Sequence, residues 1–168
     1  KDKGYATVGW GDLLQTADGG RSWSSVDLSA LGWNTRVRDL WFTNDKDGFL
    51  IGEYKFYVTK DGGNTWIEVP AVSIGDLYKI KFLNENLGFL YGGNSMIYKT
   101  SNGGNTWSQI FPGILPSKIS GIAQSSGNLF ICNNSNYSNE NARSLAVSTN
   151  EGTTWSNINY FPGGNIYH

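Results

Sequence analysis

One octapeptide occurs four times in this chain, and it constrains the fold more than any other feature of the sequence. It reads TADGGRSW from Thr16, TKDGGNTW from Thr59, TSNGGNTW from Thr100 and STNEGTTW from Ser148. Successive copies start 43, 41 and 48 residues apart. A period in this range is typical of the four-stranded blades of a β-propeller. The sequence therefore predicts an all-β chain built from repeated small sheets.

The similarity extends beyond the octapeptide to the whole period. VRDLWFTNDKDGFLIG, residues 37–52, aligns without a gap with LYKIKFLNENLGFLYG, residues 77–92. Turn residues divide one period into four short runs at 78–83, 88–92, 96–101 and 106–110, which we predict to be antiparallel strands A, B, C and D. Runs such as GFLIG are apolar at successive positions, as expected when both faces of a sheet are covered.

Each fixed position of the octapeptide has a local structural role. The Asp or Asn side chain is expected to bind backbone N–H groups just ahead of it, and the following glycine to adopt positive φ. The flanking Ser or Thr residues satisfy polar groups across the turn, and the tryptophan offers a large apolar face for burial between blades. The residues predicted to build these turns are Thr16, Asp18, Gly20 and Trp23; Thr59, Asp61, Gly63 and Trp66; Thr100, Asn102, Gly104 and Trp107; and Ser148, Asn150, Gly152 and Trp155.

The octapeptide resembles the Asp-box, or bacterial neuraminidase repeat. This repeat is found in sialidases, sortilin-type receptors, xyloglucan-cleaving glycoside hydrolases and the photosystem II assembly and stability factor family. The longer pattern here, GFLxG followed by TxDGGxTW, looks most like that last family and its bacterial relatives. The resemblance implies a β-propeller over nearly the whole chain, but it does not fix activity, because the repeat occurs in enzymes and non-enzymes alike.

Composition and charge exclude several classes of function. The 168 residues carry 13 basic and 14 acidic side chains, a net charge of -1, so the chain offers no broad positive field for nucleic acid. No run is long and apolar enough to span a membrane. With Cys132 and His168 as its sole cysteine and histidine, the chain is not expected to form a disulfide, a catalytic triad or a cysteine metal cluster. Because two of the four boxes carry Asn, we expect no metal and no cofactor there.

The strand order predicts which end of the propeller binds a ligand. The octapeptide is a C–D turn and shares one face with the A–B turns, whereas the B–C turns and the D–A connections emerge on the opposite face. Those connections vary in length, as binding loops do, and an insertion with Tyr137 lengthens the last blade. The candidate binding residues are Trp10, Asp12, Trp33, Arg36, Arg38, Glu53, Tyr54, Asp76, Lys79 and Arg143.

Catalysis by this chain is not expected. A glycoside hydrolase needs two facing carboxylates, and Asp12, Glu53 and Asp76 are the acids expected on the connection face. A sialidase would also need an arginine cluster, which the sequence does not support.

The basic residues of the A strands leave two interpretations open. Arg36, Arg38, Lys79, Lys81 and Lys118 either converge on the channel or extend separately into solvent beside Asp39 or Glu85. For the photosystem assembly family, the resemblance implies a positively charged patch used for protein recognition.

The leading hypothesis is a non-catalytic propeller that binds another protein outside the cytoplasm, in the periplasm or extracellular space. The alternative is a propeller that binds or cleaves a glycan. The expected blades are 1–30, 36–70, 77–111 and 118–159, with 160–168 beginning a further strand or closing a ring. About four blade equivalents fit either a small ring or a sector completed by further blades, from a parent chain or from other copies.

Overall fold

The computed structural model describes residues 2–9, 11–32, 36–70, 72–110, 118–133 and 145–158, and they form four antiparallel sheets. The first blade contains β1 (Gly4–Val8), β2 (Asp12–Thr16) and β3 (Ser24–Ser25), followed by the short 3-10 helix η1 (Ser29–Leu31). The second contains β4 (Asp39–Phe42), β5 (Gly48–Ile51), β6 (Phe56–Thr59) and β7 (Ile67–Glu68). The third contains β8 (Leu77–Phe82), β9 (Gly88–Gly92), β10 (Ile97–Thr100) and β11 (Ser108–Ile110). The fourth contains β12 (Ile119–Ser125), β13 (Asn128–Asn133), β14 (Leu145–Ser148) and β15 (Ser156–Ile158).

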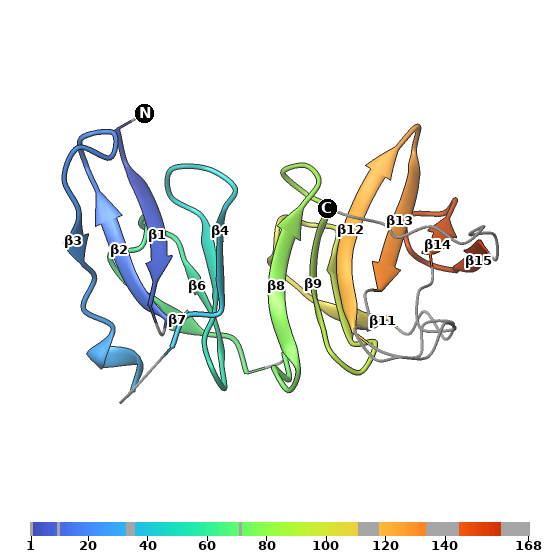
Figure 1. The fold of residues 1–168 in the computed structure, drawn as a ribbon, viewed down its shortest axis with the longest axis horizontal. Helices are drawn as coiled ribbons and strands as arrows, with labels where there is room; N and C mark the ends of the chain where they lie inside the picture. Colours follow the sequence, from blue (N-terminus) through green and yellow to red (C-terminus); the bar gives the residue numbers. More distant parts are fainter. Residues whose placement is uncertain are drawn as a thin grey trace.

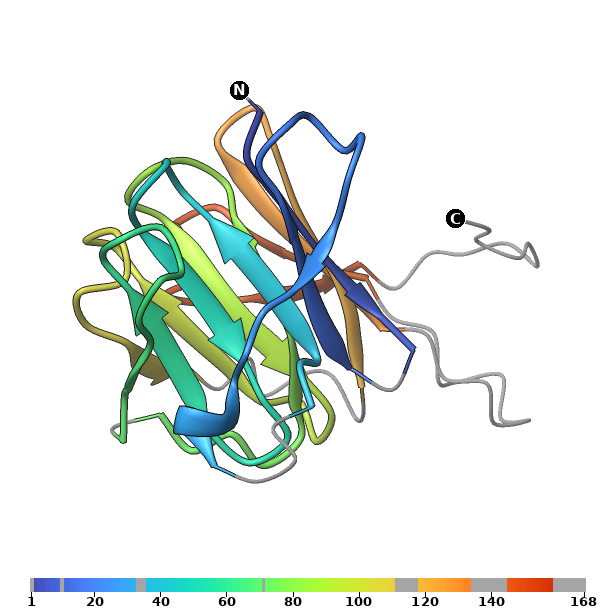
Figure 2. The ribbon, with the colours of Figure 1, turned by 90° about the vertical axis from the view of Figure 1, so that its left-hand side faces the viewer.

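Every sheet follows the order of the chain, so each strand pairs with its sequence neighbour. The second, third and fourth blades have four strands each, whereas the first has three and begins at the equivalent of strand B. The sheets stack side by side, with the first and fourth blades at opposite ends of an open arrangement (Figure 1). Figure 2 looks onto the first blade and shows the following sheets behind it. The predicted all-β propeller fold is confirmed.

The B strands lie at the centre of the second and third blades, as their continuous apolar sequences predicted. All residues of β5 and β9 are buried. Neighbouring sheets cover them from both sides, and aromatic rings fill the space between sheets. Phe49 of the second blade stacks on Phe82 of the third with ring centroids 4.8 Å apart, and Tyr5 of the first blade stacks in the same way on Phe42 of the second at 4.7 Å.

Two glycines allow the A strand of a blade to lie close to its own B strand. Phe42 pairs with Gly48, and Phe82 pairs with Gly88. A Cβ atom on Gly48 would lie 2.5 Å from the Phe42 ring, and one on Gly88 would lie 2.6 Å from the Phe82 ring. Both distances are far below van der Waals contact, so the phenylalanine ring occupies the space that the glycine leaves open.

Candidate functional site

The octapeptide forms a turn that its own side chains hold together. In the second blade, Thr59 Oγ1 donates a hydrogen bond to Asp61 Oδ1 at 2.8 Å and accepts one from the Gly63 N–H at 2.8 Å. The Asp61 carboxylate also accepts bonds from the Thr65 N–H at 2.9 Å and the Thr65 hydroxyl at 2.6 Å. The carboxylate oxygens therefore accept hydrogen bonds from the turn itself, and this geometry does not indicate a ligand site.

The same arrangement recurs in all four boxes. The first residue of each box is buried, and these four are the buried polar residues of the described chain: Thr16, Thr59, Thr100 and Ser148. Where Asn replaces Asp, the amide reverses one bond, so that Asn102 Nδ2 donates to Thr106 Oγ1 at 2.8 Å. The hydroxyl and backbone N–H bonds lower the pKa of the Asp18 and Asp61 carboxyl groups to about 2.

Three of the four box tryptophans pack against the preceding blade. Trp107 lies edge-on to Phe49 and Phe56 of the second blade, with centroids 5.9 and 5.5 Å apart. Trp66 packs on the cluster that joins the first two blades, and Trp155 on the cluster of the last two. Trp23 differs from the expected burial: its exposed fraction is 44%, because no described sheet precedes the first blade.

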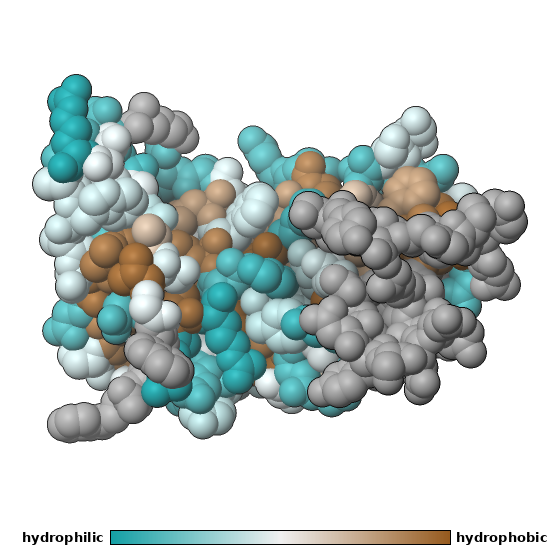
Figure 3. Space-filling view, in the orientation of Figure 1, coloured by the Kyte–Doolittle hydropathy of each residue, from teal (hydrophilic) through white to brown (hydrophobic). Residues whose placement is uncertain are grey.

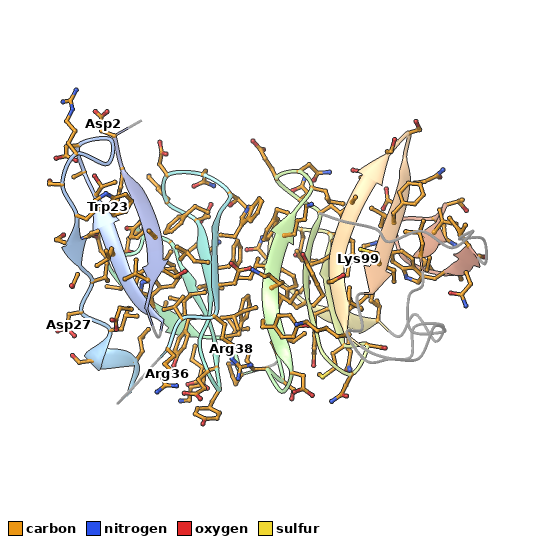
Figure 4. All side chains as sticks on the ribbon, viewed as in Figure 1. Asp2, Trp23, Asp27, Arg36, Arg38 and Lys99 are labelled. Atoms are coloured by element: carbon orange, nitrogen blue, oxygen red, sulfur yellow. The ribbon has the colours of Figure 1, made fainter. Side chains whose placement is uncertain are left out.

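The box turns lie beside the A–B turns. The Gly62 N–H donates to Lys46 O at 2.8 Å, and the Gly103 N–H donates to Asn86 O at 3.0 Å. The B–C turns and the D–A connections lie at the other ends of the strands. Figure 4 shows this separation, with Asp2 and Trp23 toward one end of the molecule and Arg36 and Arg38 at the other. We call the end that carries the B–C turns and D–A connections the connection face.

Hydrogen bonds from residues 37 and 38 join three blades on the connection face. The Val37 N–H donates to Gly11 O at 2.9 Å, which brings the residues around Arg36 to the B–C turn of the first blade. One residue further on, the Arg38 N–H donates to Ile51 O at 2.7 Å, at the start of the B–C turn of the second blade. The Arg38 guanidinium reaches the third blade, where Nη1 donates to Leu77 O at 3.0 Å and to Gly75 O at 3.4 Å.

We call the part of the connection face that these hydrogen bonds connect, from Gly11 through Arg38 to Leu77, the connection strip. Most of the predicted binding residues in the described ranges lie next to it. Asp12 follows Gly11, and Glu53 and Tyr54 form the turn after Ile51. The exposed fraction of Tyr54 is 80%, the highest of the large hydrophobic side chains described. Asp76 lies between the two carbonyl groups that Arg38 contacts, and its carboxylate accepts a hydrogen bond from the Asn94 amide of the third blade.

Arg38 is the charged side chain that links this strip to the third blade. Its guanidinium is bonded to neutral carbonyl oxygens, and it has no carboxylate partner among the described residues. A guanidinium bonded only to carbonyl groups keeps its full charge and several N–H donors. The guanidinium can therefore bind a carboxylate on the connection face.

The A strands carry the remaining basic side chains. Lys79 Nζ lies 3.9 Å from Asp39 Oδ2, which is also bonded to the Ile80 N–H at 2.9 Å. Lys118 Nζ lies 4.7 Å from the centre of the Tyr78 ring. These two lysines contact the neighbouring blade, and for Lys79 the partner is Asp39, as one of the two interpretations of the sequence expected.

Several expected residues cannot be placed. Trp10, Trp33, Tyr137 and Arg143 lie outside the described residues, as does the segment 160–168.

The three candidate acids belong to three different blades or connections, since Asp12 starts β2, Glu53 follows β5 and Asp76 precedes β8. Within the described ranges, no group of three His, Cys, Asp or Glu side chains is arranged to hold a metal ion, and no helix is long and apolar enough to cross a membrane.

The sequence interpretation missed a contact between blades. The carbonyl of Gly62, in the second box, accepts hydrogen bonds from Lys3 Nζ at 2.6 Å and Tyr5 Oη at 2.5 Å, both from the first blade. The equivalent carbonyl in the fourth box, that of Glu151, accepts one from Lys99 of the third blade. A lysine on one blade close to the box of the next blade could have indicated this contact. Its partner is a main-chain carbonyl, however, and the sequence does not show which carbonyl a lysine will bind.

Four box turns on successive antiparallel blades place this chain among the Asp-box β-propellers. A family model described as Photosynthesis system II assembly factor YCF48 matches residues 28–158, and the chain belongs to that family.

Two curated relatives match about half of the chain. The chain is 35% identical over 79 residues to the chloroplastic photosystem II stability/assembly factor HCF136 of Guillardia theta, a match that covers 45% of the chain and 20% of the relative. It is 34% identical over 80 residues to the photosystem II assembly lipoprotein Ycf48 of Picosynechococcus sp., covering 44% of the chain and 20% of the relative. Each match thus spans one fifth of the relative.

Solved structures show the same fold at low sequence identity. YCF48 from Cyanidioschyzon merolae has a TM-score of 0.66 at 19% identity, over 99% of this chain and 55% of that one. YCF48 bound to D1 peptide has a TM-score of 0.63 at 19% identity, over 92% and 50%. An ancestral GH74 enzyme has a TM-score of 0.69 at 16% identity, over 92% and 22%. The chain thus spans about half the length of the solved YCF48 chains.

Proposed function

We propose that this chain is a non-catalytic protein-binding propeller module that binds an extended segment of a partner protein on its connection face. Arg38 carries the proposal, because its guanidinium has no carboxylate partner among the described residues and lies on the same face of the molecule as the exposed Tyr54 ring. Arginine and tyrosine are among the residue types enriched at protein interfaces and at their binding hot spots. The partner segment would place a carboxylate on Arg38 and an apolar side chain on Tyr54.

Two further observations support a protein partner. The curated relatives are named as assembly factors, and one solved relative is described as bound to a D1 peptide. The connection strip also carries charges of both signs, namely Asp12, Glu53 and Asp76 together with Arg36 and Arg38. Such a mixture favours a specific segment over a general polyanion.

The proposal is tested with fluorescently labelled peptides tiled along the D1 sequence, measured by anisotropy. At least one peptide with a carboxylate should bind, and Arg38→Glu should weaken it by more than about tenfold, because the charge is reversed at the contact. Arg36→Glu provides a second variant whose side chain is exposed. Lys46→Glu makes the same charge change on the opposite face and should leave binding unchanged.

Two results would contradict this function. The first is the absence of binding by every D1 peptide, and the second is equal weakening by Lys46→Glu, which would mean that net charge alone drives association. Thermal unfolding of each variant separates lost binding from lost structure.

The same proposal includes a location outside the cytoplasm. It rests on the names of the two curated relatives, one chloroplastic and one a lipoprotein. Fractionation of cells that express the complete natural protein tests it, and recovery in the cytoplasmic fraction alone would refute it.

A further inference from the structure

Asp76 lies next to the contacts of Arg38, but the two opposite charges do not pair. The Arg38 guanidinium donates to Gly75 O at 3.4 Å and to Leu77 O at 3.0 Å, which are the carbonyl groups on either side of Asp76. Both charged side chains are exposed, and they form no ion pair with each other. Figure 3 shows hydrophilic surface over the lower ends of β4 and β8, where this part of the connection face lies.

The B–C turn of the third blade holds Asp76 instead. The Asp76 carboxylate accepts a hydrogen bond from the side-chain amide of Asn94, and the Asp76 carbonyl accepts one from the Gly93 N–H at 2.8 Å. A hydrogen bond to a carboxylate is roughly twice as strong as one between neutral groups. Asp76 is therefore bonded to this turn through both its side chain and its main chain.

Two glycines allow the turn to approach Asp76 so closely. A Cβ atom on Gly92 would lie 2.0 Å from the Asp76 carbonyl oxygen, and one on Gly93 would lie 2.9 Å from the Asp76 Cβ. Both distances are too short for a side chain to fit. The sequence Gly92–Gly93–Asn94 thus brings the amide to the carboxylate.

The tip of the same turn is strained. The Met96 N–H donates to Gly93 O at 3.0 Å and closes the turn, and the two residues between them, Asn94 and Ser95, have φ of 52° and 55°. Neither Glu53 nor Tyr54, at the tip of the B–C turn of the second blade, has a positive φ. Such strain at non-glycine residues is concentrated at functional sites. Here the strained turn carries the amide that binds Asp76.

We propose that Asn94 is a positioning residue that holds the Asp76 carboxylate away from Arg38, and so keeps the guanidinium open to the carboxylate of a partner segment. Asp76 is then an internal competitor of the ligand and not a residue that contacts it. The identity of the ligand rests on the function proposed above, whereas the position of Asp76 can be measured without a partner.

The competition follows from where the two carboxylates act. A carboxylate on the same chain has a high effective concentration at Arg38, so once released it would compete with a ligand in solution. The apparent affinity for the ligand falls with the fraction of molecules in which Arg38 remains open. An exposed ion pair is weak, so the expected loss of affinity is about two- to fivefold.

Asn94→Gly removes the amide and keeps the turn, because glycine adopts positive φ without strain. Measured by anisotropy with the D1 peptide that binds most tightly, the affinity should fall by about two- to fivefold. Ser95→Gly makes the same backbone change at the other tip residue and should leave the affinity unchanged. A peptide whose acidic residues are replaced by their amides should bind the parent and Asn94→Gly equally.

Asp76→Asn provides a rescue experiment. Added to Asn94→Gly, it removes the competing charge and should restore the affinity at least to the parent value. A purely structural role of Asn94 would not be rescued in this way, because the amide of residue 94 is still absent.

A crystal structure of Asn94→Gly without peptide tests the inference independently of any partner. An Asp76 carboxylate oxygen should then lie within about 4 Å of the Arg38 guanidinium. If no D1 peptide binds the parent protein, the proposed function fails, and this structure alone decides whether Asn94 positions Asp76.

Three results would overturn the inference. The first is an Asp76 carboxylate that stays away from Arg38 in the Asn94→Gly structure. The second is an unchanged affinity of Asn94→Gly for a D1 peptide that binds the parent. The third is a loss of affinity in Asn94→Gly that Asp76→Asn does not restore.

Discussion

Glu151 has a backbone conformation that the other three boxes give to glycine. Its φ is 54°, and the equivalent residues Gly19, Gly62 and Gly103 have φ of 73°, 70° and 67°. A side chain in this left-handed region costs roughly 1–2 kcal/mol relative to the right-handed one. The carbonyl of Glu151 accepts a hydrogen bond from Lys99, so the strained turn also holds the third and fourth blades together.

Glu151→Gly should therefore stabilise the chain by about 1 kcal/mol, since glycine adopts the same φ without strain. The main-chain bond to Lys99 is kept, and the ion pair that is lost is long, with Nζ 4.0 Å from Oε2 of an exposed Glu151 side chain. Urea denaturation measures the change. Gly103→Ala is the reverse substitution in the third box and should destabilise, and a Glu151→Gly variant less stable than the parent would contradict the argument.

The box carboxylates make stability depend on pH. The pKa of the Asp61 carboxyl is lowered from 3.8 to about 2 by hydrogen bonds from Thr65 and Thr59. A lowered pKa in the folded state means that the carboxylate stabilises the fold above pH 3.8, and that this contribution is lost as the pH falls toward 2. Asp18 behaves in the same way in the first box.

Asp61→Asn should remove part of this pH dependence, because Asn102 and Asn150 already hold equivalent turns without a charge. The unfolding midpoint in urea, measured from pH 5 to pH 2, should fall less steeply for the variant than for the parent. Asn102→Asp, which places a carboxylate in the third box, is the reverse change and should make the fall steeper. Identical slopes for Asp61→Asn and the parent would show that this carboxylate does not act on stability.

At the scale of the element, three of the four box tryptophans pack between two blades. Trp107 contacts Phe82 of its own A strand as well as Phe49 and Phe56 of the preceding blade. Trp23 has the same position in its box but lacks both partners and is 44% exposed. One residue type at one repeat position therefore has two energetic roles, and its neighbours decide which.

Trp107→Ala should cost about 3 kcal/mol, near the value for aromatic residues packed in a core. Trp23→Ala should cost under about 1 kcal/mol, as expected for an exposed site. Both values come from the unfolding free energy in urea. Equal costs would mean that the tryptophan acts within its own turn, contrary to the packing between blades.

The whole molecule is a row of sheets in which each contacts its sequence neighbours. In such arrays stability is the sum of the individual units and the interfaces between them. The second and third blades have a neighbour on both sides, whereas among the described residues the first blade has one neighbour and β1 pairs with a strand on one edge. Stability is therefore expected to be uneven along the row.

Native-state hydrogen exchange should show this gradient. Amides of β9 and β10 in the third blade should exchange most slowly, and those of β1 and β2 much faster, because fewer buried contacts must break to expose them. Uniform exchange rates across the blades would indicate a single cooperative unit instead.

The order and type of the strands follow from the sequence alone, because the repeat places turn residues and apolar runs at fixed positions. The local roles of Thr59, Asp61 and Gly63 in the turn could also be derived, since their bonds are made within one octapeptide. The separation of the box turns from the connection face required only the alternation of strand direction.

Contacts between blades were decided by the tertiary structure. The sequence did not indicate that Arg38 reaches the carbonyl of Leu77, or that Lys3 and Tyr5 bind the carbonyl of Gly62, because main-chain acceptors have no sequence signature. It also could not distinguish Trp23 from Trp107, or Gly4 from Gly88. Each pair is the same residue at the same repeat position, and burial depends on which sheet or strand lies beside it.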